Sequence, residues 1–194
     1  MDKVSYFDRE YNYIKDERIR DDLKNLVSKL PDYFFEIPAA STGKYHPLFA
    51  GSVHGLVKHT KVAVKIAYDL LGNPGINNFS DREKDLIIMS LVLHDGLKSG
   101  KIKEKYTRVD HPLLVCEFIR ENSNLSDDDI ELVVRMISSH MGIWNTDFKG
   151  NEVLPKPEDK YQRFVHMCDF LASRKFLNVN FDGIDIIEWY RLIF

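Results

Sequence analysis

Cysteine is scarce in this 194-residue sequence, which contains only two, Cys116 and Cys168. Both lie among apolar residues and they form no Cys-x-x-Cys pair, so we interpret them as reduced core residues rather than a disulfide or a zinc site. No apolar run approaches the roughly 18 residues that a membrane-spanning helix needs. The N-terminus is polar and charged, unlike a signal peptide. These absences lead us to expect a cytoplasmic protein that does not associate with a membrane.

A large excess of charge is also absent, because the formal net charge is only −3. No global basic field therefore draws the chain to nucleic acid. Apolar residues make up 44% and charged residues 29% of the chain, which is typical of a globular protein. Internal repeats and low-complexity segments are missing, and the length suits one domain with a substantial core. We therefore expect a single domain.

Apolar residues recur at helical spacing along most of the chain, which predicts an all-α fold. Helices are predicted over residues 17–30, 53–71, 81–95, 110–122, 126–142 and from 157 past Asp169. The apolar segment 184–194 is expected to be a further helix. An aromatic connector over 32–40 and loops over 41–52, 96–108 and 143–156 would join these elements.

The stretch 85–98 carries the most specific signal. Its first half is almost entirely apolar, and His94 and Asp95 then follow together. Because Ser80 can cap a first turn, we interpret this stretch as a helix, and a helix that is apolar on nearly all sides belongs in the core. It would carry two ionisable side chains to a buried end. Such groups need partners, either in a hydrogen-bonded His–Asp pair or at a metal ion.

Ionisable side chains also lie on or beside the apolar faces of other predicted helices. They are His59, His140 and Asp169, and His111 opens a further helix. One such histidine is usually a core residue with satisfied hydrogen bonds. Several on separate helices are hard to explain as coincidence, because each must satisfy its polar atoms in the core. Convergence on metal would satisfy all of them together.

The ordered set of motifs resembles the HD superfamily of metal-dependent phosphohydrolases over about residues 31–175. The similarity is greatest to the HD domain of YhaM-type 3′–5′ exoribonucleases. The motifs that carry it are Pro38-Ala-Ala40 followed by His46, Gly55-Leu-Val-Lys-His-Thr60, Leu93-His-Asp-Gly-Leu-Lys98, Ser139-His140 and Val153-Leu-Pro-Lys-Pro157. The resemblance implies one helical bundle with a metal site between its core helices. Residues 1–30 would be an N-terminal helical extension, and 176–194 a C-terminal helix.

The resemblance also implies a set of metal ligands. A mononuclear site would use His59, His94, Asp95 and Asp169. The positions that add a second metal are matched by His111 and His140, and Asp95 would bridge the two ions. Four imidazoles and two carboxylates suit iron or manganese, with cobalt, nickel or magnesium as further options. Two ions about 3.5–4 Å apart would activate a shared water, so no serine or cysteine nucleophile is needed.

Several residues near these ligands are candidates for further roles. Lys98 follows Asp95 by one turn, and we expect it to pair with phosphate or to orient a ligand, in catalysis or substrate binding. Arg108 and the lysines of 101–105 would form an anion-binding loop, with a solvated loop as the alternative. His46 is a candidate for reaching the substrate from its own loop.

Other histidines and one tryptophan receive different interpretations. His54 falls on the helix face that carries Lys58, Lys61 and Lys65, so we interpret this face as exposed. His166 precedes Asp169 by one turn and is not expected to be a ligand. Trp144 has two interpretations, stacking on a nucleobase or packing in the core.

The resemblance implies hydrolysis of a phosphoester or phosphodiester by metal-activated water. The family's Ser-His-His-Gly pattern reads Ser139-His140-Met141-Gly142 here, and residues 1–30 are too few for the exoribonuclease's separate nucleic-acid-binding domain. We therefore expect a phosphorylated small molecule or short nucleic acid as partner: a nucleotide, cyclic nucleotide or short oligonucleotide. Three alternatives remain, namely a 3′–5′ exoribonuclease, a diiron HD-type oxygenase with the same six ligands, and a non-catalytic metal-bound nucleotide sensor.

Overall fold

The structure, a computed structural model, describes residues 2–40 and 46–187 of the chain. The described part contains eight α-helices, which are α1 (Asp8–Tyr11), α2 (Glu17–Lys29), α3 (Asp32–Glu36), α4 (Gly55–Gly72), α5 (Asp81–Leu93), α6 (His111–Asn122), α7 (Asp127–Ser138) and α8 (Lys160–Ala172). Two short 3₁₀ helices, Val4–Phe7 and Leu48–Ala50, and one antiparallel hairpin of β1 (Phe181–Asp182) and β2 (Asp185–Ile186) complete the fold. The prediction of an all-α fold is confirmed.

The long helices begin where the sequence caps them. The Ser80 hydroxyl accepts the backbone N–H of Glu83, and the Glu83 carboxylate accepts the N–H of Ser80, which forms a capping box at the start of α5. Asp159 and Gln162 form the same reciprocal pair at the start of α8, and Ser126 caps α7. These side chains satisfy backbone N–H groups that have no partner within the helix, so they define its first residue.

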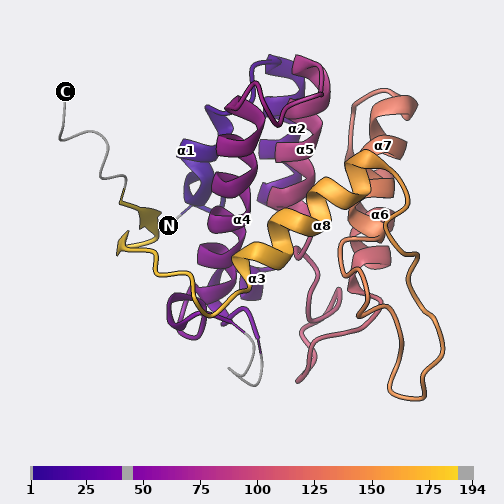
Figure 1. The fold of residues 1–194 in the computed structure, drawn as a ribbon. Helices are drawn as coiled ribbons and strands as arrows, with labels where there is room; N and C mark the ends of the chain where they lie inside the picture. Colours follow the sequence, from indigo (N-terminus) through magenta and orange to yellow (C-terminus); the bar gives the residue numbers. More distant parts are fainter. Residues whose placement is uncertain (1, 41–45, 188–194) are drawn as a thin grey trace.

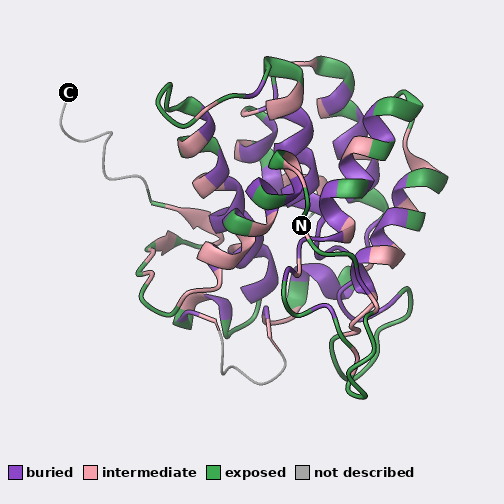
Figure 2. Cartoon of the chain, turned by 45° about the vertical axis from the view of Figure 1, so that its right-hand side comes forward, coloured by how far each residue is buried: buried purple, intermediate pink, exposed green. Residues whose placement is uncertain are grey.

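Helix α5 lies at the centre of the fold. It packs against α2, α4, α7 and α8, and α8 crosses in front of it in Figure 1. Every residue from 86 to 93 is at most 2% exposed. Figure 2 shows the same distribution across the molecule, with buried residues on the inner faces of the helices and exposed residues on their outer faces and in the loops. The prediction of a fully buried helix that delivers His94 and Asp95 into the core is confirmed.

The ends of five helices meet at one end of the bundle, the lower end in Figure 1. They are the N-terminal turns of α4 and α6, the C-terminal ends of α5 and α7, and the last turn of α8. The loops over residues 94–110 and 139–159 lie at this same end. Side chains at these helix ends can therefore converge, although they are far apart in the sequence.

Three predicted elements differ in the structure. Residues 181–186 form a hairpin rather than part of a C-terminal helix over 176–194, and residues 188–194 lie outside the described part of the chain. The two turn residues are Gly183 and Ile184, and Gly183 has φ +60°, which glycine adopts without steric cost at the first position of a hairpin turn. The connector over 32–40 contains the short helix α3, which begins directly after Pro31. The helix predicted to end at residue 142 ends at Ser138, so His140 lies in a turn.

The N-terminal segment is part of the core. Phe7, Tyr11 and Ile14 are at most 2% exposed, so the expected helical extension over 1–30 is helical but not peripheral. Across the described ranges, none of the helices combines the length and the apolar character that crossing a membrane requires.

Candidate metal centre

Six ionisable side chains converge at the lower end of the bundle. His59 lies in the second turn of α4, His94 ends α5 and Asp95 follows it, His111 begins α6, His140 lies just past α7, and Asp169 is in the last turn of α8. The four imidazoles and Asp95 are at most 1% exposed, and the Asp169 side chain is 17% exposed. They form overlapping groups of three in which the possible ligand atoms lie within 4.8 Å of one another. The structure thus brings together all six predicted ligands.

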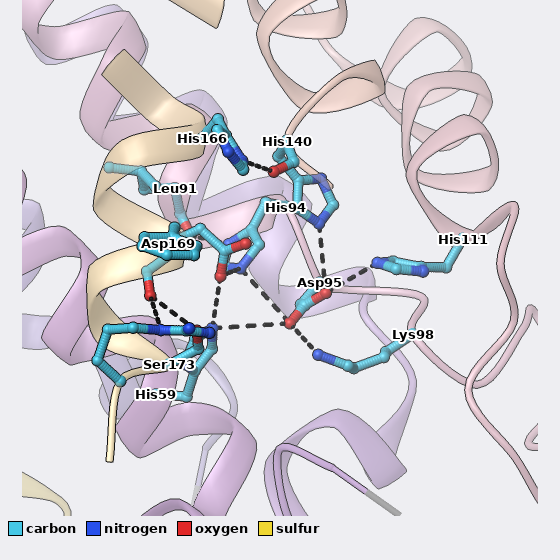
Figure 3. A network of polar contacts seen from close by, with 12 residues as sticks. His59, Leu91, His94, Asp95, Lys98, His111, His140, His166, Asp169 and Ser173 are labelled. Carbon is cyan, nitrogen blue, oxygen red and sulfur yellow. Dashed lines mark hydrogen bonds and ion pairs between the residues drawn. The ribbon is translucent and has the colours of Figure 1, made fainter. Parts of the chain in front are cut away.

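Asp95 occupies the middle of this cluster (Figure 3). Its Oδ1 atom lies 2.9 Å from His111 Nε2 and 3.7 Å from His140 Nε2. Its Oδ2 atom lies 3.4 Å from His94 Nε2 and 4.0 Å from His59 Nε2. The two oxygens of one carboxylate therefore face two different pairs of imidazoles.

Asp169 completes one side of the cluster. Its Oδ1 atom lies 2.8 Å from His59 Nε2 and 3.4 Å from His94 Nε2. We call His59, His94, Asp169 and the Oδ2 atom of Asp95 the first subsite. The second subsite contains His111, His140 and the Oδ1 atom of Asp95. Asp95 belongs to both.

Three of the imidazoles are oriented in the same way, by the backbone. Each donates its Nδ1–H to the carbonyl oxygen three residues earlier: His94 to Leu91 at 2.6 Å, His111 to Arg108 at 2.6 Å and His140 to Ile137 at 2.8 Å. This bond places a proton on Nδ1, so that Nε2, directed into the cluster, offers its lone pair whenever the imidazole is neutral. Leu91 and Ile137 lie in the last turns of α5 and α7, where carbonyl groups lack a partner within the helix.

The cluster contains buried polar atoms without hydrogen-bond partners. Among the described residues, none forms a hydrogen bond with the Nε2 atoms of His94, His111 and His140 or with Asp95 Oδ1. The close approach of His111 Nε2 to Asp95 Oδ1 does not have hydrogen-bonding geometry. Burying such atoms unpaired is costly, and a bound cation is one of the few arrangements that satisfies them. Imidazole and carboxylate together suit divalent transition metals, so these residues could hold metal ions.

The charges in the cluster are coupled. Burial disfavours the His94 imidazolium, but the Asp95 and Asp169 carboxylates outweigh burial and raise the pKa of His94 to about 10. Burial opposes ionisation of Asp95, yet Lys98 and His94 hold the pKa of Asp95 well below its usual value. Burial likewise opposes ionisation of Asp169, while His59 and His94 hold its pKa well below the usual value. A proton on His94 thus compensates the carboxylates in the metal-free protein, and metal binding would release it.

Lys98 belongs to the buried centre. It is 9% exposed, and its Nζ donates to Asp95 Oδ2 at 2.5 Å. A turn in which the Lys98 N–H donates to the Asp95 carbonyl at 3.0 Å brings the side chain back to the carboxylate. Lys98 is therefore not a solvated side chain at a helix end. Its position matches the predicted role of orienting a metal ligand.

Arg108 contacts the site through its backbone. Its carbonyl oxygen accepts the His111 Nδ1–H, while its guanidinium donates to Asp110 at 2.8 and 2.7 Å and to Glu104 at 2.6 Å. The side chain is thus paired with two carboxylates of its own loop. Substrate binding by Arg108 stays a prediction, and it would require this pairing to open.

The remaining histidines occupy three different environments. The His46 ring lies edge-on to His59 with centroids 5.0 Å apart, and burial, followed by His59 and Lys98, lowers the pKa of His46 to about 3. His54 is half-buried and donates to the Phe35 carbonyl, so its interpretation as exposed is wrong. His166 donates its Nδ1–H to the His140 carbonyl at 2.6 Å. It therefore supports a candidate ligand through the backbone, a role that its spacing in the sequence did not indicate.

Two further side chains depart from their interpretation. Trp144 is 48% exposed, so the core-packing alternative is wrong. Lys61 is 1% exposed rather than solvated on the lysine face of α4. In both cases the contacts come from distant segments, which periodicity along one helix cannot show.

No protein-family model, no curated protein and no solved structure matches this chain. The structure shows a mostly helical protein with a buried cluster of histidines and aspartates between its helices.

Proposed function

We propose that this protein is a metal-dependent phosphohydrolase of the HD superfamily that cleaves a phosphoester or phosphodiester bond of a nucleotide, cyclic nucleotide or short oligonucleotide. The observation that carries the proposal is the position of Asp95, a buried carboxylate whose two oxygens face two separate pairs of imidazole Nε2 atoms. A shared carboxylate between two sets of nitrogen ligands is the arrangement that a dinuclear centre requires. The order of the ligand motifs along the chain supports the same family.

The residues fit two divalent ions, of which iron or manganese suits the ligands best. The first subsite would hold one ion and the second subsite the other, with Asp95 as the bridge. When bound, such ions supply a water of lowered pKa as the attacking group and stabilise charge on phosphoryl oxygens. Lys98 keeps Asp95 ionised and in position, and the Nδ1–H bonds to backbone carbonyls hold the imidazoles with Nε2 directed inward.

Features outside the ligand set support water as the nucleophile and an anion as the substrate. Burial raises the pKa of Cys116 to about 12 and raises that of Cys168 as well, so neither thiol is ionised for attack at neutral pH. The loop that follows Asp95 carries Lys101, Lys103 and Lys105, all exposed. This local positive charge lies beside the centre in a chain of net charge −3, which favours a small anion over a long polyanion.

A hydrolysis screen of the manganese- or iron-loaded protein tests the proposal. The panel contains nucleotides, cyclic nucleotides and an oligonucleotide length series at fixed salt, each assayed with and without oxygen. We expect oxygen-independent release of phosphate or nucleotide that is lost in Asp95→Ala. Asp85→Ala is the matched control, because Asp85 is also a buried carboxylate of the α5 region but accepts the backbone N–H groups of Lys15 and Asp16 instead.

The other outcomes separate the alternatives. A steep rise of kcat/KM beyond about ten nucleotides would indicate an extended binding track and an exoribonuclease. Turnover only in the presence of oxygen would indicate an oxygenase. Tight metal binding without turnover of any member of the panel would leave a metal-bound sensor and contradict the proposed hydrolase.

A further inference from the structure

Exposed Trp144 and half-buried Phe170 form an aromatic pair whose two members lie close in the chain to two candidate ligands. The Trp144 and Phe170 rings stack with centroids 6.0 Å apart and an interplanar angle of 21°. Phe170 directly follows Asp169, and Trp144 follows His140 by four residues. The pair therefore joins the turn after α7 to the last turns of α8, the two segments that supply these ligands. Trp144 is 48% exposed, so much of its indole surface faces solvent.

The chain around Trp144 holds the indole in place without burying it. The His166 ring donates to the His140 carbonyl. Gly142 lies so close to the His166 ring that a Cβ atom on residue 142 would be 2.2 Å from it. Gly142 also has φ +61°, so glycine is favoured at this turn for both reasons. On the other side of Trp144, Asn145 is 2% exposed and its Nδ2 donates to the Leu154 carbonyl at 3.1 Å.

A positive charge lies against the Phe170 ring. The Arg174 guanidinium carbon is 4.0 Å from the Phe170 ring centroid, and its Nε donates to the Phe170 carbonyl at 3.1 Å. Phe170, the residue after Asp169, thus has both an indole and a cation as neighbours. An aromatic surface with an adjacent cation suits a ligand that is flat at one end and anionic at the other.

Stability alone does not account for this arrangement. Burying an aromatic ring contributes to folding in proportion to the area removed from water, and Trp144 leaves about half of its surface exposed. A ring that is exposed and already stacked on one side loses little conformational freedom when another flat ring stacks on it. Phe170 directly follows the candidate ligand Asp169 and carries this ring, which favours a role in substrate recognition.

We propose that Trp144, supported by Phe170, is the stacking subsite for the nucleobase of the substrate and determines the preference of the enzyme for base-containing phosphoesters. This inference rests on the proposed phosphohydrolase function and adds to it a binding contact for the part of the substrate that does not react. Stacking tolerates any base because every base has a flat face, so the subsite selects nucleotides over sugar phosphates rather than one base over another.

The first test compares two phosphoesters that differ only by the base. The two compounds are adenosine 5′-monophosphate and ribose 5-phosphate. Hydrolysis of each is assayed with the manganese-loaded full chain, with Trp144→Ala and with Trp144→Phe. We expect the ratio of kcat/KM for the nucleotide to that for the sugar phosphate to fall roughly 5- to 150-fold in Trp144→Ala, through KM, and to recover largely in Trp144→Phe. An unchanged ratio would overturn the inference and leave the proposed hydrolase intact.

Tyr68→Ala is the matched control for this comparison. Tyr68 is also a partly exposed ring, 44% exposed, and it stacks on Tyr13 with centroids 3.9 Å apart. It lies nine residues beyond His59 on α4, which is about 13 Å along the helix. The Tyr68→Ala variant should keep the wild-type ratio. A similar loss in both variants would show a general effect of removing surface rings and would overturn the subsite.

The second test does not depend on hydrolysis. The sequence contains one other tryptophan, Trp189, and the Trp189→Phe variant makes Trp144 the only source of indole fluorescence. We expect adenosine to quench this fluorescence saturably and ribose to leave it unchanged. Quenching without turnover of any phosphoester would support the subsite and contradict the proposed function. Absence of quenching, whether or not phosphoesters are hydrolysed, would overturn the subsite.

Discussion

Helix α4 contributes one residue to each of two buried clusters of ionisable groups, and the two clusters are built differently. His59 belongs to the candidate metal centre, whereas Lys61, two residues later, belongs to a cluster with Glu10 and Asp185 that we call the Lys61 cluster. Lys61 Nζ lies 3.0 Å from Glu10 Oε2 and 2.6 Å from Asp185 Oδ1. Burial raises the pKa of Glu10, and the Lys61 ammonium opposes that rise.

The difference between the clusters lies in their hydrogen bonding. In the Lys61 cluster the buried ammonium is paired with two carboxylates, so the cluster is satisfied by the chain itself. In the metal centre, the Nε2 atoms of His94, His111 and His140 are buried and unpaired among the described residues. A satisfied buried ion pair links distant segments, here the N-terminal helices, α4 and the hairpin. Unpaired buried nitrogens directed at one another instead indicate a ligand from outside the chain.

The strongest separation of the two clusters comes from Asp95→Ala. This change removes the carboxylate shared by both subsites, so we expect bound metal and hydrolysis to fall to background while the far-ultraviolet circular dichroism spectrum stays helical. The substitution also leaves the Lys98 ammonium buried without its partner. The Asp95→Ala/Lys98→Met variant removes both charges and should recover stability but not metal. Hydrolysis at the wild-type rate in Asp95→Ala would rule out the assigned centre.

The second subsite is tested by counting metal. Elemental analysis after iron or manganese loading should approach two ions per chain in the wild type and one in His111→Ala or His140→Ala, because the first subsite retains its four ligands. His54→Asn is the matched control, since it removes a half-buried imidazole that donates to the Phe35 carbonyl, outside the cluster. A wild-type ratio that stays near one would reduce His111 and His140 to supporting roles.

The Lys61 cluster should respond in the opposite way. Lys61→Met leaves the Glu10 carboxylate buried without its cation, and breaking a buried pair in this manner costs about 3–5 kcal/mol of unfolding free energy. Denaturant unfolding should show this loss while the number of metal ions per folded chain stays unchanged. The Glu10→Gln/Lys61→Met variant, which removes both charges, should recover part of the stability. A loss of metal without a loss of stability would show that the two clusters are not independent.

The smallest effect is expected from pH. The pKa of His94 is raised to about 10 in the metal-free protein, above its usual 6.5, so the imidazolium stabilises the fold fully below pH 6.5. That contribution is lost as pH rises through about 10. Denaturant unfolding without metal should therefore show falling stability over this range, while the apparent metal affinity rises because fewer protons are displaced. Metal binding at pH 7.5 that releases no proton in calorimetry would contradict this assignment.

The sequence predicted the buried cluster of histidines and aspartates better than its surroundings. Each candidate ligand lies on an apolar face or at the end of a helix, where short-range periodicity and capping place it. The sequence therefore named all six before the structure: His59, His94, Asp95, His111, His140 and Asp169. The carbonyl oxygens that orient the imidazoles follow from the same local rule, since they lie three residues before each histidine at a helix end or in the turn before α6. Periodicity therefore contained most of the information about the ligands.

The errors concern contacts between distant segments. Lys61 falls on the lysine face of α4 by helical spacing, yet Glu10 and Asp185 cover it from opposite ends of the chain. The C-terminal segment was predicted as a helix from its apolar residues, although Gly183 favours the turn that the structure shows between β1 and β2. Trp144 is apolar enough for a core, but its position next to Phe170 at the surface depends on how α7 and α8 cross.

The sequence by itself determined the helices, their caps and the identity of the buried ionisable groups, because these depend on residues within a few turns of one another. Only the tertiary structure decided which buried charges pair within the chain and which remain unpaired. Lys61 and His59 have almost the same local sequence environment, and the segments that pack against each make the difference. Glu10 and Asp185 neutralise Lys61. His59 pairs with Asp169, but the helix ends around it also bring His94, His111 and His140, whose Nε2 atoms stay unpaired among the described residues.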